Sequence, residues 1–471
     1  MKPTPSALWH QPQLRRHHYV VYAVHSGKGI AVGNQRDIIL MGLVPCPLPC
    51  RLHSTDSESN SSYHLHSDPS SSSSISSQPS LASLPSISSI SSQLSLASVP
   101  SLSQHVLQQT PTTQLNCIAT LKSDSSSVCS LVISGEFFYT GSSDGEIRSW
   151  SCRDISSNTS KLLATTNSTV KSLVIVGHKI FSAHQDHKIR VWQVDTTNPN
   201  DHKSKCKCIA TLPTLKDRIP KLFSPKSYVE VRRHKKLTWV HHVDAISALA
   251  VSKDESLVYS ASWDRTFKIW RTSDFKCLES VSNAHEDAIN AIVVSNDGFV
   301  YTGSADKKIK VWKKLTGDKH HTLVETLEKH KSAVNALAFS SDGGVLYSGA
   351  CDRSVLVWER ESDGGGMVVI GALRGHTKAI LCLAVVGDLV CSGSADCSVR
   401  IWRRGIGDGR SYSCLGVLEA HRRPVKCLTA AVGFDGDDKS GRVDSFVVYS
   451  GSLDCDIKVW QIQVPYLVNS S

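Results

Sequence analysis

A seven-residue phrase that begins with Asp and ends with Trp occurs seven times along this chain of 471 residues. The phrases are 144–150, 186–192, 264–270, 306–312, 352–358, 396–402 and 454–460. In each phrase the residue three positions after the Asp is Ile, Val or Phe, as expected of a strand whose side chains alternate between core and solvent. A Ser or Thr stands four residues before every Asp. Such fixed offsets predict a single structural unit that is repeated seven times.

The spacing of the phrases indicates what the unit is. Successive Trp residues are 42, 78, 42, 46, 44 and 58 positions apart, and a period of about 40–45 residues is typical of a propeller blade with four strands. Two further features repeat with the phrase. A short strand begins at Cys117, Cys208, Cys277 and Cys414, and a His stands four residues before an Ile or Val at His242, His285, His330, His376 and His421. We therefore predict an all-β protein, a seven-bladed β-propeller.

The repeats resemble the WD40 repeat family over about residues 115–462. The family's Gly-His pair is literal only at Gly375-His376, and none of the seven phrases is followed by the Asp of a Trp-Asp pair. The resemblance implies a hydrogen-bonded tetrad of Trp, Ser or Thr, His and Asp in each blade, which would satisfy the polar groups of all four buried side chains. Blades one and two carry Asp124 and Thr166 in place of the His, so we expect weaker tetrads there.

The predicted tetrad residues recur from blade to blade. They are Thr140, Asp144 and Trp150; Ser182, Asp186 and Trp192; His242, Ser260, Asp264 and Trp270; His285, Thr302, Asp306 and Trp312; His330, Ser348, Asp352 and Trp358; His376, Ser392, Asp396 and Trp402; and His421, Ser450, Asp454 and Trp460. A Ser-His-Asp hydrolase triad is needed once, beside an oxyanion hole, so the repetition argues against catalysis. The sequence contains no nucleophile elbow, zinc-protease motif or phosphate-binding loop. We predict no enzymatic activity, no cofactor and no metal, including at the acidic loop 433–444.

The repeats also predict how the domain is bounded and closed. We place the propeller at 115–462, with repeats at about 117–152, 165–195, 242–272, 285–314, 330–360, 376–404 and 421–462, and a tail at 463–471. The strand 117–121 precedes the first repeat, and the last repeat lacks a convincing fourth strand. We expect this strand to complete blade seven and close the ring, which removes open sheet edges.

Composition separates the first 114 residues from the propeller. Between Ser67 and Gln104, 19 of 38 residues are Ser, and such a segment buries too little apolar surface to fold, so we predict a disordered, phosphorylatable region at 1–114. The chain has no apolar run long enough for a membrane span and no secretory signal pattern. We expect the protein in the cytoplasm or nucleus, with an organelle transit peptide as the alternative. The net charge of +10 permits acidic partners.

A basic insertion at about 213–241 lengthens the interval between blades two and three, and we place it on the face of the Asp turns. In the nearby turn, Trp263 precedes Asp264 where the other blades carry smaller residues. Trp and Arg are favoured interface anchors. The candidate partner-binding residues are Trp239, Trp263, Arg265, Arg232, Arg233, Lys235 and Lys236. The alternatives are a solvated cover or weak nuclear-import signal in the insertion, and a Trp263 that packs beneath it.

The insertion and the phrases SASWDRTFKIW and GSADKKIKVW resemble plant Jingubang-type WD-repeat proteins. This resemblance implies a soluble regulatory protein of plants, without catalysis, that acts through protein contacts. Our leading hypothesis is an interaction scaffold that binds proteins or peptides, acidic or phosphorylated ones among them, through the face of the Asp turns. The alternatives are a nucleic-acid-binding propeller that uses the 213–241 insertion and a substrate receptor of a ubiquitin ligase.

Overall fold

The structure is a computed structural model that describes residues 22–23, 99–104, 113–123, 126–155, 158–194, 206–222, 228–232, 235–315, 317–361, 366–405, 410–433 and 443–465. The chain divides into two compact units, one made of 1–25 and 99–471 and the other of 26–98. All the described residues belong to the first unit. The predicted disorder of the Ser-rich segment up to residue 98 lies outside the described residues.

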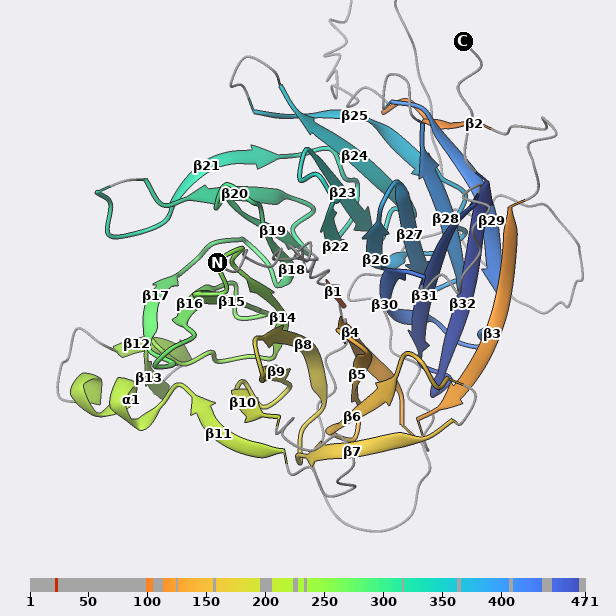
Figure 1. Cartoon of the computed structure of the whole chain (residues 1–471). Coiled ribbons are helices and arrows are strands. Elements are labelled where there is room, and N and C mark those ends of the chain that lie inside the picture. The colour runs from red at the N-terminus through yellow and green to blue at the C-terminus, as the bar shows by residue number, and fades with distance from the viewer. Residues whose placement is uncertain are drawn as a thin grey trace, which may run out of the picture. The chain divides into compact units, whose positions relative to one another are not determined.

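The first unit contains a seven-bladed β-propeller (Figure 1). Each blade has four antiparallel strands, with the first of them nearest the axis of the ring. Blades one to three are β4 (Val128–Ser134), β5 (Phe137–Ser142), β6 (Glu146–Ser151) and β7 (Ser160–Thr165); β8 (Val170–Val176), β9 (Lys179–His184), β10 (Ile189–Gln193) and β11 (Lys207–Leu212); and β14 (Ile246–Val251), β15 (Leu257–Ser262), β16 (Phe267–Arg271) and β17 (Cys277–Val281). Blades four to six are β18 (Ile289–Val294), β19 (Val300–Ser304), β20 (Ile309–Lys313) and β21 (Thr322–Leu327); β22 (Val334–Phe339), β23 (Val345–Ala350), β24 (Ser354–Arg360) and β25 (Met367–Arg374); and β26 (Ile380–Val386), β27 (Leu389–Ser394), β28 (Ser398–Arg404) and β29 (Tyr412–Glu419).

Blade seven is built from both ends of the propeller sequence. Its strands are β30 (Val425–Val432), β31 (Val443–Ser452), β32 (Asp456–Pro465) and, on the outside, β3 (Gln114–Lys122). β3 pairs antiparallel with β32, with Leu121 opposite Ile457. The predicted closure is therefore confirmed. β32 also continues past residue 463, where we expected a tail, because Val464 is buried in the core.

The blades fit together because the second strand of each blade presents a small residue to the next blade. This residue directly follows the Ser or Thr of the repeat, and it is Gly141, Ala183, Ala261, Gly303, Gly349, Gly393 or Gly451. A Cβ on Gly303 would lie 2.8 Å from the side chain of Val334, the first residue of the next inner strand, and a Cβ on Gly349 would overlap Ile380 in the same way. The small residue thus lets β-branched side chains close the interface between blades, where packing is as dense as in a crystal.

The outer strands share the register that the cysteines indicated. Cys117, Cys208, Cys277 and Cys414 each lie opposite the Trp of their blade, next to a β-bulge. The thiol of Cys117 donates to the carbonyl of Ala119 at 3.5 Å, and the other three thiols make the equivalent bond to the carbonyl two residues ahead. The repeated Cys therefore marks one bulge in the fourth strand.

Residues 99–104 are ordered, although we predicted disorder for the whole of 1–114. The Leu102 amide donates to the carbonyl of Ala372 on β25 at 2.9 Å, and β2 (Ser103–Gln104) pairs parallel with β29. The Leu102 side chain packs on Gly371, where a Cβ would collide with it. The segment is ordered because two apolar side chains, Val99 and Leu102, pack against the core at blades five and six.

A second short segment lies on the axial side of the ring. β1 (Tyr22–Ala23) pairs antiparallel with β26, with Tyr22 opposite Leu383 and Ala23 opposite Cys382 (Figure 1). β26 is the inner strand of blade six, and its other edge is taken by β27. The axial edge of β26 therefore accepts an extended chain.

The insertion between blades two and three forms α1 (Leu215–Leu222) and a hairpin of β12 (Tyr228–Arg232) and β13 (Lys235–Thr238). Thr214 caps α1, because its hydroxyl accepts the amide of Asp217 at 3.3 Å and donates to the carboxylate of Asp217 at 2.9 Å. This carboxylate also accepts the amide of Cys277 at 3.2 Å, which holds the insertion on the outer strand of blade three. Among the described residues no helix is long and apolar enough to cross a membrane.

Candidate interaction site

Five blades bring together a Trp, a Ser or Thr, a His and an Asp. In blade four the indole of Trp312 donates to the hydroxyl of Thr302 at 2.9 Å, and His285 lies 2.8 Å from that hydroxyl through Nε2 and 2.8 Å from Asp306 through Nδ1. The carboxylate of Asp306 also accepts two backbone amides. Blades three, five, six and seven repeat the side-chain contacts at 2.8–3.0 Å. Each buried polar group thus has a partner, as a water-free interior requires.

In blade two a different histidine takes this place. His184 on β9 is fully buried, its Nε2 lies 2.7 Å from the hydroxyl of Ser182, and the same hydroxyl accepts the indole of Trp192 at 2.7 Å. Thr166, which we expected to replace the histidine, lies 3.4 Å from His184 Nδ1. Asp186 pairs instead with a guanidinium on β10 at 2.6 Å. Blade two thus lacks the His at the expected position, as predicted, but His184, two residues along the strand from Ser182, reaches the same hydroxyl.

Blade one holds only part of the arrangement within the described residues. The indole of Trp150 donates to the hydroxyl of Thr140 at 3.1 Å. The carboxylate of Asp144 accepts the hydroxyl of Ser142 and the amide of Glu146. Asp124, the residue at the His position, lies outside the described residues.

The tetrad of blade five predicts a contribution to acid sensitivity. Burial alone would raise the pKa of Asp352, but the hydrogen bond and charge of His330 outweigh it, with help from Ser354, and lower the pKa to about 2. A carboxyl with a folded-state pKa below its ordinary value stabilises the fold above that value, and the stabilisation is lost as the pH falls through the folded pKa. We expect the free energy of unfolding to fall from about pH 4 to about pH 2, and to fall less in Asp352→Asn. Denaturant titrations at each pH measure this, and equal slopes for both proteins would contradict it.

A β-bulge occurs at the second residue of every inner strand. In β4 the register shifts between Val128 and Ser130, so Cys129 is skipped in the pairing with β5, and the other six inner strands shift at the equivalent place. The bulged residues are Cys129, Lys171, Ser247, Asn290, Asn335, Leu381 and Lys426. Bulges redirect side chains and are common beside functional sites. This set, which we call the bulge ring, surrounds the axis of the propeller.

Side-chain hydrogen bonds join neighbouring blades at the level of the bulge ring. In blades three, four and five the bulged residue makes the bond, as Asn290 does when its amide donates to the carbonyl of Val334 at 3.0 Å. In blades six, seven, one and two the following residue makes it. These bonds run from the Cys382 thiol to the Val425 carbonyl, from the Cys427 thiol to the Val128 carbonyl, from the Leu173 amide to the Ser130 hydroxyl and from the Leu249 amide to the Ser172 hydroxyl. The bulged residues of these four blades are Leu381, Lys426, Cys129 and Lys171.

Two of these four side chains are buried amines. Lys171 on β8 and Lys426 on β30 are 5% and 6% exposed, and Cys129 stands between them on β4. Burial lowers the pKa of Lys171 to about 8, with Cys129 opposing the shift and Lys426 adding to it. Burial lowers the pKa of Lys426 as well. Charge held away from water is unfavourable, which is why burial lowers the pKa of both amines.

The structure places the sequence-predicted binding residues in different surroundings. Trp263, in the turn between β15 and β16, has Lys171 Nζ 5.6 Å from the centre of its ring, a cation–π distance. Arg265 is exposed in the same turn. Trp239 packs, half-buried, on the core between blades two and three, and its carbonyl accepts Lys268 Nζ at 2.7 Å. Trp239 is thus held by packing, whereas Trp263 lies beside the bulge ring.

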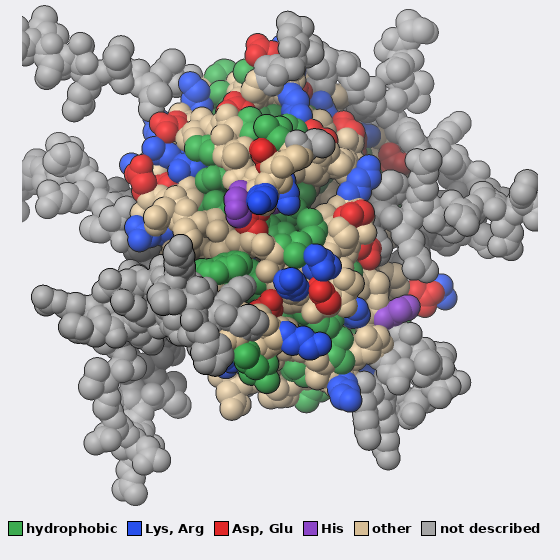
Figure 2. Space-filling model, turned by 90° about the vertical axis from the view of Figure 1, so that its left-hand side faces the viewer, with side chains coloured by type: hydrophobic (Ala, Val, Ile, Leu, Met, Phe, Trp, Pro, Cys, Tyr) green, Lys and Arg blue, Asp and Glu red, His purple; other side chains and the backbone are tan. Residues whose placement is uncertain are grey.

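The basic cluster of the insertion belongs to the β12–β13 hairpin. Arg232 stands opposite Lys235, and Glu230 stands opposite Lys236. The side chains of these residues, and Arg233 as a whole, lie outside the described residues. On the face seen in Figure 2, the described Lys and Arg side chains alternate with Asp, Glu and apolar ones. The described side chains of that face therefore form no continuous basic stripe of the kind that tracks a nucleic-acid backbone.

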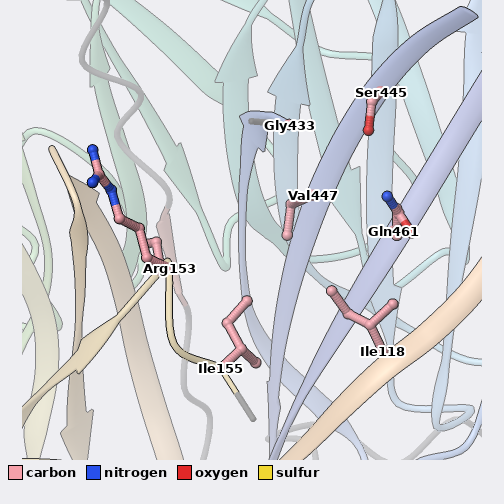
Figure 3. A pocket seen from close by; sticks show the side chains of 8 residues that line it. Ile118, Arg153, Ile155, Gly433, Ser445, Val447 and Gln461 are labelled. Carbon is pink, nitrogen blue, oxygen red and sulfur yellow. The ribbon is translucent and has the colours of Figure 1, made fainter. Parts of the chain in front are cut away.

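A cavity of about 440 Å³ lies where the ring closes, between blades seven and one (Figure 3). It is lined by Ile118, Cys152, Arg153, Ile155, Gly433, Ser445, Val447 and Gln461. Its one charged lining residue, Arg153, pairs with the exposed Glu136 at 2.6 Å. Among the described residues no three His, Cys, Asp or Glu side chains are placed to hold a metal ion; the acidic stretch 434–442 is not among them. The lining of this cavity contains no acid–base pair.

The sequence pattern of the WD domain, G-beta repeat, matches residues 115–151, 234–271, 275–313, 321–359, 367–403 and 412–461, about half of the chain. The chain belongs to the WD-repeat family. The matched segments correspond to blade one and blades three to seven. They leave out blade two, the WD repeat whose buried histidine stands on its second strand.

Curated WD-repeat relatives match parts of this propeller. The chain is 33% identical over 102 residues to the small ribosomal subunit protein RACK1 of Drosophila melanogaster, which covers 21% of this chain and 30% of that protein. It is 26% identical over 213 residues to autophagy-related protein 16 of Arabidopsis thaliana, 44% of this chain and 40% of that one. With striatin-4 of Mus musculus the identity is 30% over 161 residues, 30% and 19% of the two chains. The chain thus spans less than half the length of each of these relatives.

Proposed function

We propose that this WD-repeat chain is a non-catalytic interaction protein that binds other proteins through the bulge ring and the neighbouring Asp turns. The observation that carries the proposal is the bulge ring itself, in which the second residue of every inner strand is displaced from the strand pairing around the axis. A rigid ring of packed blades suits recognition, because it holds turns from all blades around one surface. WD propellers typically bind other proteins.

Trp263 is the anchor that we propose for this surface. It is half-buried and lies beside Lys171, and Trp is among the residues that are enriched in interface hot spots. We further propose that the protein is a plant regulator of the Jingubang type that acts in the cytoplasm or nucleus. The amino-acid sequence of the insertion and of blades three and four, which resembles that of the Jingubang-type proteins, supports this assignment.

Affinity capture from plant tissue with the full chain tests the proposal. Trp263→Ala is expected to weaken the binding of the captured partners by about thirtyfold or more, because hot-spot truncations cost at least about 2 kcal/mol of binding free energy. Phe137→Ala is the matched control, since Phe137 is an exposed aromatic at the opposite end of a blade, where it begins β5. Thermal unfolding of both variants should match that of the wild type. Capture of the same partners by all three proteins would contradict the proposal.

A further inference from the structure

The loop that leads into each inner strand places two residues beside the Asp turn, directly after the tetrad His. The first of the two is held by its backbone. The amide of Lys331 donates to the carboxylate of Asp352 at 2.9 Å. The amide of Arg422 makes the equivalent bond to Asp454 at 2.8 Å. The tetrad thus fixes where these residues stand on the face of the Asp turns, while their side chains are exposed.

The charge at these two positions changes around the ring. Blades three and four carry acidic side chains there, namely Asp244, Glu286 and Asp287. Blades five to seven carry basic ones, and blade five adds an exposed Arg in the Asp turn itself. We call the exposed cations of these three blades the basic arc, which consists of Lys331, Arg353, Lys378, Arg422 and Arg423.

The acids of blade four have cations of their own, whereas the basic arc has no counter-ion among the described residues. In blade four the amine of Lys308 lies 3.7 Å from the carboxylate of Glu286 and 3.0 Å from that of Glu328. None of the five side chains of the arc forms an ion pair with a described residue. Glu419, which is exposed at the end of the outer strand β29, does not pair with them. Like charges on one surface repel one another, so an anionic partner would relieve this repulsion.

We propose that the basic arc binds a short acidic segment of a partner protein, one that contains several Asp or Glu residues. The inference rests on the proposed function and names the chemistry of the partner. The arc spans three blades and ends at the acids of blade four, so it suits a few carboxylates in succession. A longer polyanion that follows the ring would reach Glu286 and Asp287, whose charge opposes it. Exposed contacts of this kind are individually weak, but together they attract the partner and select for its charge.

Selection of a random-peptide display library on the immobilised full chain tests this inference. We expect the enriched peptides to share several Asp or Glu residues. A synthetic copy of an enriched peptide should bind about tenfold more weakly to the variant Lys331→Gln, Lys378→Gln, Arg422→Gln, because three exposed ion pairs of ordinary strength together amount to about that factor. Binding to the wild type should weaken with added salt, since exposed charges are screened. Thermal unfolding of the variant should match that of the wild type, because the three side chains are exposed.

The control is the triple variant Lys253→Gln, Lys276→Gln, Lys314→Gln. It removes the same charge from exposed side chains at the opposite ends of the strands, after β14, β16 and β20, and it should bind the acidic peptide as the wild type does. Enriched peptides without shared acids, equal binding by the two triple variants, or tighter binding of a short oligothymidine strand than of the peptide would overturn the inference and leave the interaction role in place. A selection without any enriched peptide would overturn the inference too, and a lack of captured tissue partners would in addition overturn the interaction role.

Discussion

Deleting residues 114–122 is expected to destabilise the whole propeller and not just one strand. β3 is the outer strand of blade seven, and it joins the start of the ring to its last strand, β32. Without β3, the edge of β32 is exposed and the ring is open between blades seven and one. We expect the deletion variant to unfold at a much lower denaturant concentration than the full chain, in a transition that circular dichroism and Trp fluorescence report together.

Two point variants on β3 test whether its buried side chains stabilise the closed ring. Leu121 is 2% exposed and belongs to the core between blades seven and one, so Leu121→Ala should lower the free energy of unfolding by about 2–5 kcal/mol. Ile118 on the same strand is 47% exposed, so Ile118→Ala should change it by no more than about 0.5 kcal/mol. A deletion variant with the wild-type midpoint, or equal effects of the two substitutions, would show that β3 does not close the ring.

The histidines of blades two and four are expected to be equally important for stability. His285→Ala removes the partner of both Thr302 and Asp306, and His184→Ala removes the partner of Ser182. Each should lower the free energy of unfolding by about 1–3 kcal/mol, the usual effect of leaving a buried polar group unpaired. Chemical denaturation of the full chain measures both.

His178→Ala is the control for blade two, because its side chain is exposed in the turn between β8 and β9. The His178→Ala variant should unfold at the same denaturant concentration as the wild type. If His184→Ala behaved like His178→Ala, the buried histidine of β9 would have no structural role and the arrangement in blade two would be the weaker one that the sequence suggested.

The seven blades could be predicted because the signal is local and repeated. A buried indole needs an acceptor and a strand alternates its faces, so the offsets from Ser or Thr to Asp and Trp are the same in every blade. The closing strand could be predicted as well, because a lone strand before the first repeat matched the strand missing from the last.

His184 was missed although the sequence contains a signal for it. Ser182 and His184 are two residues apart in one strand, so their side chains point to the same face. The repeat pattern places the histidine before the first strand of the blade, so it did not predict a histidine on the second strand. The segment 99–104 was missed for another reason, since a Ser-rich composition conceals the two apolar side chains that hold it on blades five and six.

By itself, then, the sequence determined the number of blades, their order and the way in which the ring closes, because these depend on spacing along the chain. It did not determine which side chains of the bulge ring bridge the blades. Those bonds join residues far apart in the sequence, such as Cys427 and Val128, which are 299 positions apart. The burial of Lys171 and Lys426 around the axis follows from the same long-range contacts. Only the tertiary structure could decide it, because the solvation of a charge is set by whatever surrounds it in space.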